Sequence, residues 1–276
     1  MPATPNSMEP VISVKKLSKK FGDFIAVNEI DFDVQKGEIF AFLGPNGAGK
    51  STTIKMLTTL MQPTSGELYL AGFDVTKEQD SVRKSFGIVF QDPSLDDELT
   101  AYENMMIHAT MYAIPHHERN SKIEELLKLV DLWERRKGRI KTFSGGMRRR
   151  LEIARALLHH PQIMFLDEPT LGLDVQTRNL LWNYVKELNR LKGMTIFFTT
   201  HYLGEAEDVA QRIAIIDHGN IVAMGTVEEL RAKTGGTRDL EEAYLVLTGK
   251  EVRDETLDTE GVNKERNRSI IKAKTR

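Results

Sequence analysis

Short apolar runs alternate along the chain with longer segments of helical periodicity. The runs cover Val11–Val14, Glu38–Leu43, Gly87–Phe90, Ile163–Leu166, Thr195–Thr199 and Arg212–Ile216. Several are apolar at nearly every position, as is typical of strands that are covered on both faces. Such strands separated by helices predict an α/β fold with a mainly parallel core sheet. Two segments with alternating polarity, Ile25–Val34 and Glu67–Tyr69, predict a small antiparallel β-subdomain beside it.

Between Asp92 and Arg150 the strand pattern gives way to helical spacing. Thr100 with Glu103, and Ser121 with Glu124, have the spacing of capping boxes, so each pair predicts the start of a helix. Apolar residues continue at helical spacing after the second pair. We therefore expect residues of about 92–150 to form a helical subdomain inserted between strands of the main sheet.

The pattern changes again near the C-terminus. Thr226 with Glu229 predicts another helix start. Four apolar residues then follow at helical spacing, namely Leu240, Ala243, Tyr244 and Leu247. Basic residues dominate the last part of the chain, which favours a mobile tail. We expect a main domain over 11–235 and a C-terminal extension, with one helix and a mobile basic tail, over 236–276.

Composition narrows the possible classes of protein. The 276 residues carry a net charge of −2 and no cysteine, which excludes disulfides and thiolate chemistry and indicates no general attraction to nucleic acid. No apolar run approaches the roughly 18 residues of a membrane helix, and the first residues do not have the pattern of a signal peptide. These features predict a cytoplasmic protein.

The strand at Glu38–Leu43 runs directly into a glycine-rich segment that matches the P-loop pattern G-x-x-x-x-G-K-[ST]. Its residues are Gly44, Pro45, Asn46, Gly47, Ala48, Gly49, Lys50, Ser51 and Thr52. The three glycines allow backbone angles that turn successive N–H groups toward one anion, and the next helix adds its positive N-terminus. We expect Lys50 to reach the β- and γ-phosphates and the Ser51 hydroxyl to hold Mg²⁺. A glycine-rich turn that binds nothing is the alternative, but strand, loop, lysine and serine together favour nucleotide binding.

An acidic pair, Asp167 and Glu168, follows the apolar run Ile163–Leu166. We expect Asp167 to hold Mg²⁺ through water and Glu168 to polarise the attacking water. An acidic pair after a strand is by itself more often a solvated turn. Together with the P-loop, it indicates hydrolysis of a nucleoside triphosphate.

Between these two sites lies a third motif, Ser144, Gly145 and Gly146, flanked by Phe143 and Met147 and followed by an arginine-rich run. The order and spacing of the three motifs resemble the ATP-binding-cassette (ABC) ATPases, whose signature is commonly Leu-Ser-Gly-Gly-Gln. The two flanking residues depart from that pattern. The resemblance covers roughly 11–235 and implies the ABC type of P-loop NTPase fold, with ATP and Mg²⁺ as ligands.

The resemblance also implies roles for four further residues. Phe21 occupies the position of an aromatic residue that stacks on adenine, although a strand residue in the core is the alternative. Gln91 matches the glutamine that senses Mg²⁺ and couples to the helical subdomain. Asp174 matches the key residue of a loop that contacts the partner subunit. His201 matches the histidine that contacts the γ-phosphate.

In that family the signature caps ATP held by a second subunit, so the resemblance implies a head-to-tail homodimer with two sandwiched ATP molecules. The sequences around Ser144 and His201, and the segment 240–249, are similar to the daunorubicin-resistance-type exporter ATPases. Those proteins work with a separately encoded ABC-2-type permease, which implies a location on the inner face of the membrane. A soluble ABC ATPase acting on DNA or ribosomes and an importer ATPase are the alternatives.

Eight Arg or Lys residues and no acidic residue lie within 135–150. A nucleic-acid or lipid-headgroup patch is one interpretation. No aromatic side chains are interleaved for base stacking, apart from Phe143 of the signature. We therefore favour a solvated helix face and expect no nucleic-acid partner.

Overall fold

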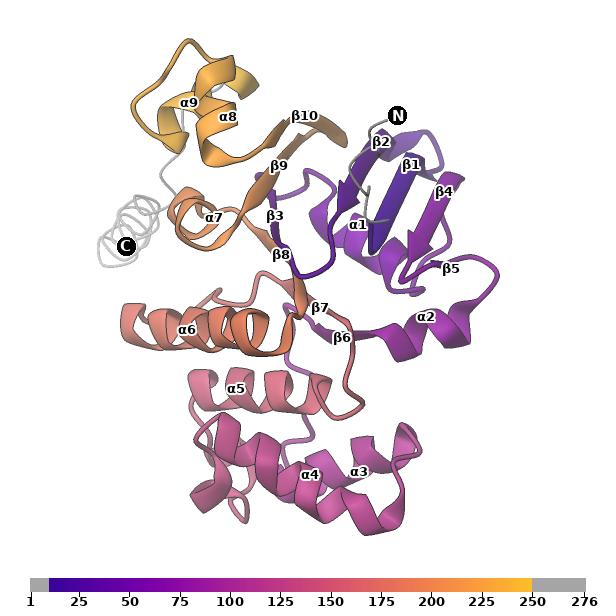
Figure 1. The fold of residues 1–276 in the computed structure, drawn as a ribbon, viewed down its shortest axis with the longest axis vertical. Helices are drawn as coiled ribbons and strands as arrows, with labels where there is room; N and C mark the ends of the chain where they lie inside the picture. The colour runs from indigo at the N-terminus through magenta and orange to yellow at the C-terminus, as the bar shows by residue number, and fades with distance from the viewer. Residues whose placement is uncertain (1–9, 250–276) are drawn as a thin grey trace, which may run out of the picture.

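The computed structural model describes residues 10–249, and its centre is a six-stranded sheet in the order β10-β9-β3-β8-β7-β6 (Figure 1). The strands are β3 (Ile39–Leu43), β6 (Phe86–Val89), β7 (Ile163–Asp167), β8 (Thr195–Thr200), β9 (Arg212–Asp217) and β10 (Asn220–Gly225). Neighbours from β9 to β6 pair in parallel, whereas β10 pairs antiparallel with β9. The prediction of a mainly parallel core sheet is confirmed, and β10 is an added hairpin strand that the pattern did not predict.

A second sheet is antiparallel and has the order β2-β1-β4-β5. Its strands are β1 (Ile12–Phe21), β2 (Phe24–Val34), β4 (Ser65–Leu70) and β5 (Phe73–Asp74). The expected antiparallel layer is therefore present. Strand β1 runs well past Val14, where the apolar pattern ends, because its more polar second half continues to pair with β2 as far as Phe21.

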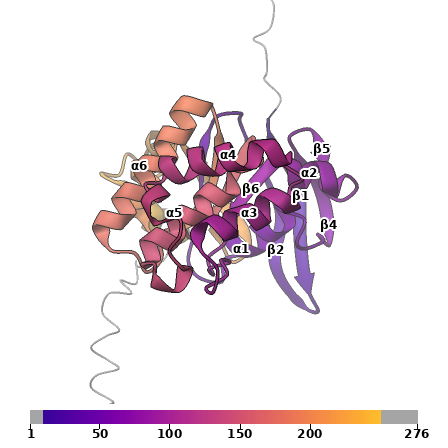
Figure 2. The ribbon, with the colours of Figure 1, turned by 90° about the horizontal axis from the view of Figure 1, so that it is seen from below.

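Helices α1 (Lys50–Leu57) and α2 (Gln79–Ser85) accompany the first half of the chain. The segment between β6 and β7 is helical, as expected, and contains α3 (Ala101–Met111), α4 (His116–Leu129), η1 (Trp133–Arg135), η2 (Ile140–Thr142) and α5 (Gly145–Ala156). Figure 2 shows α5 and α6 on one side of the molecule, α3 and α4 in the middle, and the antiparallel strands β1, β4 and β5 on the other side. The capping box of Thr100 and Glu103 at the start of α3 is confirmed.

The second predicted capping box, Ser121 with Glu124, is wrong. Helix α4 begins at His116 directly after Pro115, and Ser121 lies inside it with its hydroxyl donating to the Glu118 carbonyl at 2.9 Å. Pro115 fixes its own φ near the value that a helix needs, and Glu118 places a negative charge in the first turn. These two features favour an earlier start than the serine.

Four further helices lie in the described part of the chain: α6 (Val175–Lys192), α7 (Leu203–Val209), α8 (Val227–Lys233) and α9 (Leu240–Thr248). The capping box of Thr226 and Glu229 opens α8, and α9 forms where the apolar spacing predicted a helix. Leu240 and Ala243 are fully buried, so α9 packs onto the body of the protein. The predicted mobile tail lies outside the described residues. Within residues 10–249, no helix combines the length and hydropathy needed to span a membrane.

Apolar side chains cover both faces of the main sheet. Ile39, Ala41 and Leu43 of β3 face the helices of one side, while Phe40 and Phe42 face the antiparallel sheet. On the second face, Phe40 and Phe197 have ring centroids 5.6 Å apart. Burial on both faces explains why the strands are apolar at successive positions. This burial also holds the carboxyl ends of β3, β7 and β8 in place. The polar residues of the predicted site follow these strand ends.

Candidate nucleotide site

The P-loop joins β3 to α1 in a conformation that requires glycine. Gly47 and Gly49 have φ values of +80° and +109°, as the motif predicts. Gly44 does not have a positive φ. Its requirement is close packing, because a Cβ atom there would lie 2.2 Å from the carbonyl oxygen of Ile216. The loop is thus tightly curved at Gly47 and Gly49, and it packs closely against β9 at Gly44.

Lys50, the first residue of α1, is almost completely buried. Its ammonium group donates to the carbonyl oxygens of Gly44 at 2.7 Å and Pro45 at 3.1 Å. It also forms an ion pair with Glu168, with 3.1 Å between Nζ and Oε1. Since an ammonium has three N–H donors, these three acceptors satisfy it. The P-loop lysine and the acidic strand end therefore meet in one chain, as the sequence predicts.

Glu168 lies between two cationic or hydrogen-bonding groups. Besides Lys50, its other carboxylate oxygen is 3.1 Å from Nδ1 of His201. Burial alone would raise the pKa of Glu168, but the hydrogen bond from His201 and the charge of Lys50 outweigh it and lower the pKa to about 2. The residue also has a φ of +45°, a strained value for a side chain with a Cβ. A buried, strained and ionised carboxylate is typical of a functional position.

Ser51 and Asp167 supply oxygen ligands beside this carboxylate. The Ser51 hydroxyl donates to Oδ1 of Asp167 at 3.2 Å, and the Thr199 hydroxyl donates to the same oxygen at 2.6 Å. Mg²⁺ prefers such hard oxygen ligands and usually takes only one or two from protein, with phosphates and waters as the rest. No cluster of three or more His, Cys, Asp or Glu side chains suited to a metal occurs within the described ranges. The donor set thus fits Mg²⁺ that is held jointly with a nucleotide.

Thr199 and Glu205 belong to the site, and the sequence did not indicate them. The Thr199 hydroxyl also accepts from the backbone N–H of Glu168 at 3.0 Å, so one side chain holds both acidic residues. Glu205 of α7 accepts from the hydroxyls of Thr170 and Thr200. These bonds join the end of β7 to the end of β8, directly before His201. Threonine and glutamate at those positions follow no motif spacing, so only the fold reveals their contacts.

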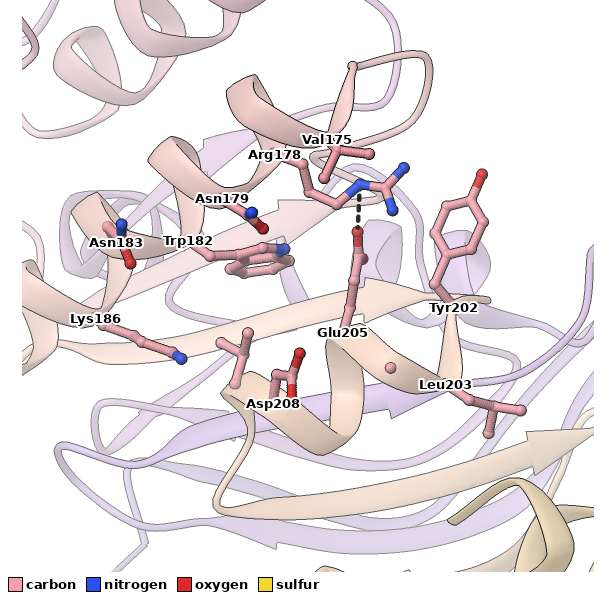
Figure 3. A pocket seen from close by; sticks show the side chains of 12 residues that line it. Val175, Arg178, Asn179, Trp182, Asn183, Lys186, Tyr202, Leu203, Glu205 and Asp208 are labelled. Carbon is pink, nitrogen blue, oxygen red and sulfur yellow. Dashed lines mark ion pairs between the residues drawn. The ribbon is translucent and has the colours of Figure 1, made fainter. Parts of the chain in front are cut away.

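Glu205 also lines an open groove of about 410 Å³ between α6 and α7. Figure 3 shows Arg178 and Trp182 of α6 on one side of this groove and Glu205 of α7 on the other, with an Arg178–Glu205 ion pair of 3.4 Å. None of the P-loop residues lines it. The groove therefore borders Val175 and Tyr202, the neighbours of Asp174 and His201 in the chain, while the P-loop lies elsewhere.

The signature residues and Asp174 are not joined to this centre. Ser144 caps α5 by accepting from the Met147 N–H at 3.3 Å, and Gly145 and Gly146 form the first turn of that helix. Asp174 caps α6 in the same way, accepting from the Thr177 N–H at 2.9 Å. Within residues 10–249, no hydrogen bond or ion pair connects these residues with Lys50, Asp167 or Glu168. They present two helix N-termini instead.

Phe21 and Gln91 lie at the periphery. Phe21 ends β1 with 47% of its surface exposed, and the Lys19 ammonium lies 5.2 Å from its ring centroid. The alternative of a core residue is therefore wrong, and a role in stacking on a base stays a prediction. Gln91 is exposed in the segment after β6, and its carbonyl oxygen accepts from the Arg149 guanidinium at 3.1 Å.

The basic stretch 135–150 is largely engaged within the protein. Arg148 forms an ion pair with Asp97 at 2.6 Å, and Arg150 donates to the Val130 carbonyl at 3.0 Å. Arg136 stacks over the Trp133 ring, with 4.1 Å between the guanidinium carbon and the centroid. Much of this charge is therefore used in internal contacts of the helical segment.

A P-loop beside an acidic strand end, with a buried carboxylate held by lysine and histidine, defines the site of a nucleoside triphosphatase. Comparison with known proteins makes the class specific. The family model described as ABC transporter matches residues 27–171, which is about half of the chain, and the chain belongs to this family. It is an ABC ATPase and the ATP-binding subunit of a transporter.

Related proteins agree with this assignment. The chain is 42% identical to the linearmycin resistance ATP-binding protein of Bacillus subtilis (strain 168), over 86% of this chain and 78% of that protein. It is also 42% identical to the daunorubicin/doxorubicin resistance ATP-binding protein of Streptomyces peucetius, over 81% of this chain and 68% of that protein. The resemblance to daunorubicin-resistance-type ATPases is thereby confirmed.

Solved structures show the same fold. One, described as the ATP-binding subunit of an ABC transporter, has a TM-score of 0.78 and 32% identity, covering 86% of this chain and 99% of that one. Another is a dimeric ATP-binding cassette in a post-hydrolysis state bound to ADP and Pi. Its TM-score is 0.70 and its identity 30%, over 78% of this chain and 98% of that one.

Proposed function

We propose that this chain drives an ABC-2-type exporter as one half of a head-to-tail homodimer, with ATP held between the P-loop of one copy and the signature of the other. The observation that carries the proposal is the separation of two half-sites. Lys50, Ser51, Asp167 and Glu168 are assembled within one chain, whereas Ser144 and Asp174 begin α5 and α6 without a contact to them. A second copy related by a two-fold axis brings both halves together.

The P-loop residues Gly44, Pro45, Asn46, Gly47, Ala48, Gly49, Lys50, Ser51 and Thr52 would bind the phosphates of ATP. Phe21 would stack on the adenine. Gly145 and Gly146 of the second copy would supply the N–H groups that begin α5, and Ser144 its hydroxyl, to the γ-phosphate. Asp174 would contact the opposite subunit. The Lys50 ammonium, the backbone N–H groups and the Ser144 hydroxyl would neutralise or orient charge that develops during in-line attack.

Ser51 and Asp167 would hold Mg²⁺, and Gln91 would sense it. The bound metal supplies neutralisation of the β- and γ-phosphate charge. The Thr199 hydroxyl keeps the Asp167 carboxylate oriented toward Ser51. Weakening this contact should therefore weaken metal retention before it weakens nucleotide binding.

Glu168 would act as the general base for the attacking water, with Gln91 and His201 positioning that water. In the structure Lys50 pairs with Glu168 and helps to hold its pKa near 2, which makes the carboxylate a weak base. When Lys50 turns to the phosphates, Glu168 loses that charge and its pKa rises. The lysine therefore links substrate binding to the basicity of the group that activates water.

The exporter class rests on the relatives, which are named for resistance to linearmycin, daunorubicin and doxorubicin. A separately encoded permease is supported by cbiO1 from Clostridium perfringens, described as part of the transporter complex cbiONQ, with a TM-score of 0.75 and 26% identity. We propose a drug, lipid or polysaccharide as the exported class and a position on the inner face of the cell membrane.

Purification of the tagged full chain from detergent-solubilised membranes of its own organism tests this proposal. We expect a multi-span membrane protein to co-purify at a fixed ratio and vanadate-sensitive ATP hydrolysis to accompany it. The Lys50→Ala chain should retain the partner and lose the hydrolysis. Recovery of the chain with ribosomes or DNA, and with no membrane protein, would contradict the transport function.

A further inference from the structure

Three charged side chains lie in a row along one face of α5, and all three are buried. Arg149 and Arg155 are each 7% exposed and Glu152 is 2% exposed, at a spacing of three residues. Residues three apart on a helix lie on the same face. Buried charges are rare in proteins unless they are paired. This row therefore needs a reason beyond the packing of the helix.

Each member of the row contacts the segment 90–94, which follows β6 and contains Gln91. Arg149 donates to the carbonyl oxygen of Phe90 and, at 3.1 Å, to that of Gln91. Glu152 accepts from the backbone N–H of Ser94 at 2.8 Å, and Arg155 donates to the Ser94 carbonyl at 2.7 Å. Gln91 and Ser94 are themselves exposed. The exposed segment 90–94 is thus held in place by buried charged side chains of α5.

Two members of the row are bonded to each other, and the third is linked to them through Ser94, which contacts both Glu152 and Arg155. Arg149 and Glu152 form an ion pair of 3.0 Å within the helix. Burial lowers the pKa values of both guanidinium groups, and the Glu152 carboxylate opposes that change. The forked guanidinium of Arg149 can reach two carbonyl oxygens together with a carboxylate, a geometry that a lysine ammonium cannot reproduce. We call Arg149, Glu152 and Arg155 the α5 cluster.

Helix α5 begins at the signature. Ser144 is its N-cap, and Arg149 follows five residues later, a rise of about 7.5 Å at 1.5 Å per residue. A helix of this length moves as a rigid body. The residues proposed to meet the partner's ATP and the residues that hold the backbone of Gln91 therefore share one element.

We propose that the α5 cluster is a positioning device that fixes Gln91 relative to the signature of the same chain. Helix α5 carries both the signature residue Ser144 and the α5 cluster. Engagement of Ser144 by the opposite subunit therefore sets the position of Gln91 in the chain's own site. The inference rests on the proposed dimer and on the proposed role of Gln91. None of the three residues forms a hydrogen bond or ion pair with Lys50, Ser51 or Glu168. Arg149 contacts the Gln91 carbonyl directly, while Glu152 and Arg155 hold the same segment at Ser94.

A double-mutant cycle tests this inference. Arg149→Met is made in the full-length wild-type chain and in a Gln91→Ala chain, and ATP hydrolysis is measured with saturating ATP and Mg²⁺. We expect Arg149→Met to lower kcat roughly tenfold to a hundredfold, since a misplacement of about 1 Å has effects of that size. The dissociation constant of ATP should change less than about twofold, because the P-loop is untouched. In the Gln91→Ala chain the same substitution should have no further effect on kcat.

Arg150→Met is the matched control. Arg150 is the next residue of α5 and also donates to a backbone carbonyl, but that carbonyl belongs to Val130 in the helical segment. It should leave kcat within about twofold of wild type. Arg149→Lys keeps the charge and loses the fork, so it should also lower kcat, by less than Arg149→Met.

Removal of Arg149 alone leaves Glu152 buried without its partner, so Arg149→Met carries a risk to folding. The pair Arg149→Met with Glu152→Leu removes both charges, and the midpoint of thermal unfolding reports whether the chain is folded. An unchanged kcat in this folded double variant overturns the inference. An equal loss of kcat in the wild-type and Gln91→Ala chains overturns it too, since the cluster would then act independently of Gln91. If Gln91→Ala itself leaves kcat unchanged while Lys50→Ala abolishes it, the inference fails and the assignment of the P-loop stands.

Discussion

Two regions of this molecule carry the motifs of one reaction, and their local structures differ sharply. In the phosphate centre, Lys50, Asp167 and Glu168 are buried and bonded to one another or to neighbouring hydroxyls. At the starts of α5 and α6, Ser144 and Asp174 are exposed and bond only to the next turn of their own helix. The first region is assembled by the fold of one chain. The second is ordered locally and faces outward.

The difference shows what a single chain can preorganise. Buried ionic groups need partners in the same chain, because a buried charge without one would destabilise the fold. Exposed helix N-termini need no partner in the same chain, because water solvates them. They can therefore bind an anion that another subunit supplies. The contrast predicts that substitutions in the first region change chemistry and stability in one chain. Substitutions in the second region should act only where two chains meet.

The largest expected effect follows removal of the ammonium group from the phosphate centre. Lys50→Ala should abolish ATP hydrolysis and most ATP binding, because within the described P-loop segment Lys50 is the one cationic side chain. It also leaves the buried Glu168 with His201 alone as its side-chain partner. Titration with a fluorescent ATP analogue and a phosphate-release assay measure both effects. Full turnover by this variant would break the assignment of the P-loop.

The second prediction concerns pH and separates the buried carboxylate from the exposed ones. The pKa of Glu168 in the folded protein is about 2, below its ordinary value of 4.5. Its ionised form therefore stabilises the fold above about pH 4.5, and the contribution is lost as the pH falls toward 2. Its size is on the order of 3 kcal/mol. The difference in unfolding free energy between wild type and Glu168→Gln should be largest at pH 6. It should decrease steadily as the pH falls from 5 to 3. A difference that does not change over that range would contradict the bonds of Glu168 described above.

The third prediction addresses the hydroxyl that holds both acidic residues. Thr199→Val keeps the size of the side chain but removes the donor to Asp167 and the acceptor for the Glu168 N–H. We expect the Mg²⁺ concentration for half-maximal hydrolysis to rise about tenfold to a hundredfold, as is usual for loss of a ligand-orienting partner. Thr195→Val, in the same strand but bonded to the Gly37 N–H, is the control and should leave it unchanged. If both variants need the same Mg²⁺ concentration for half-maximal hydrolysis, Thr199 has no role in orienting the metal ligand.

The smallest expected effect concerns the exposed aromatic side chain at the end of β1. Phe21→Ala should weaken ATP binding by about 1–3 kcal/mol, the range for loss of one base stacked on an aromatic ring. Phe21→Trp should preserve binding. Phe24, which pairs with Phe21 across the hairpin and is 64% exposed, provides the matched control as Phe24→Ala. Unchanged affinity in Phe21→Ala would place the stacking group elsewhere.

The sequence predicted the elements that are long or strongly patterned. Five of the six predicted apolar runs formed strands of the main sheet, since burial on both faces leaves an apolar run. The sixth run, Val11–Val14, instead belongs to β1 of the antiparallel sheet, because its apolar side chains are buried there as well. Strand β5 has only two residues, and β10 is an outer strand whose side chains are mostly exposed or half-buried, so neither leaves a continuous apolar run of buried positions. The start of α4 was missed because Pro115 and Glu118 favour an earlier beginning than Ser121, and spacing alone does not weigh these effects.

The candidate site divides in the same way. Lys50, Ser51, Asp167 and Glu168 follow motif spacing, and the parallel sheet brings them together at the carboxyl ends of its strands. Thr199, Glu205 and the α5 cluster have no spacing rule. Their contacts join residues far apart in the chain, as Arg149 and Phe90 show. Such pairs depend on how β6, β8 and α5 pack, which local sequence does not specify.

The most direct test of the account is the oligomeric state of Glu168→Gln in ATP and Mg²⁺. Gln keeps the size of the side chain but cannot accept the proton, so hydrolysis should fall by roughly 10²–10⁴-fold while ATP stays bound. Size-exclusion chromatography should then show a dimer, because the closed state is no longer relieved by loss of the γ-phosphate. Adding Ser144→Arg should return the chain to a monomer. A dimer that survives Ser144→Arg, or a Glu168→Gln chain that stays monomeric even with its membrane partner, would contradict the shared site.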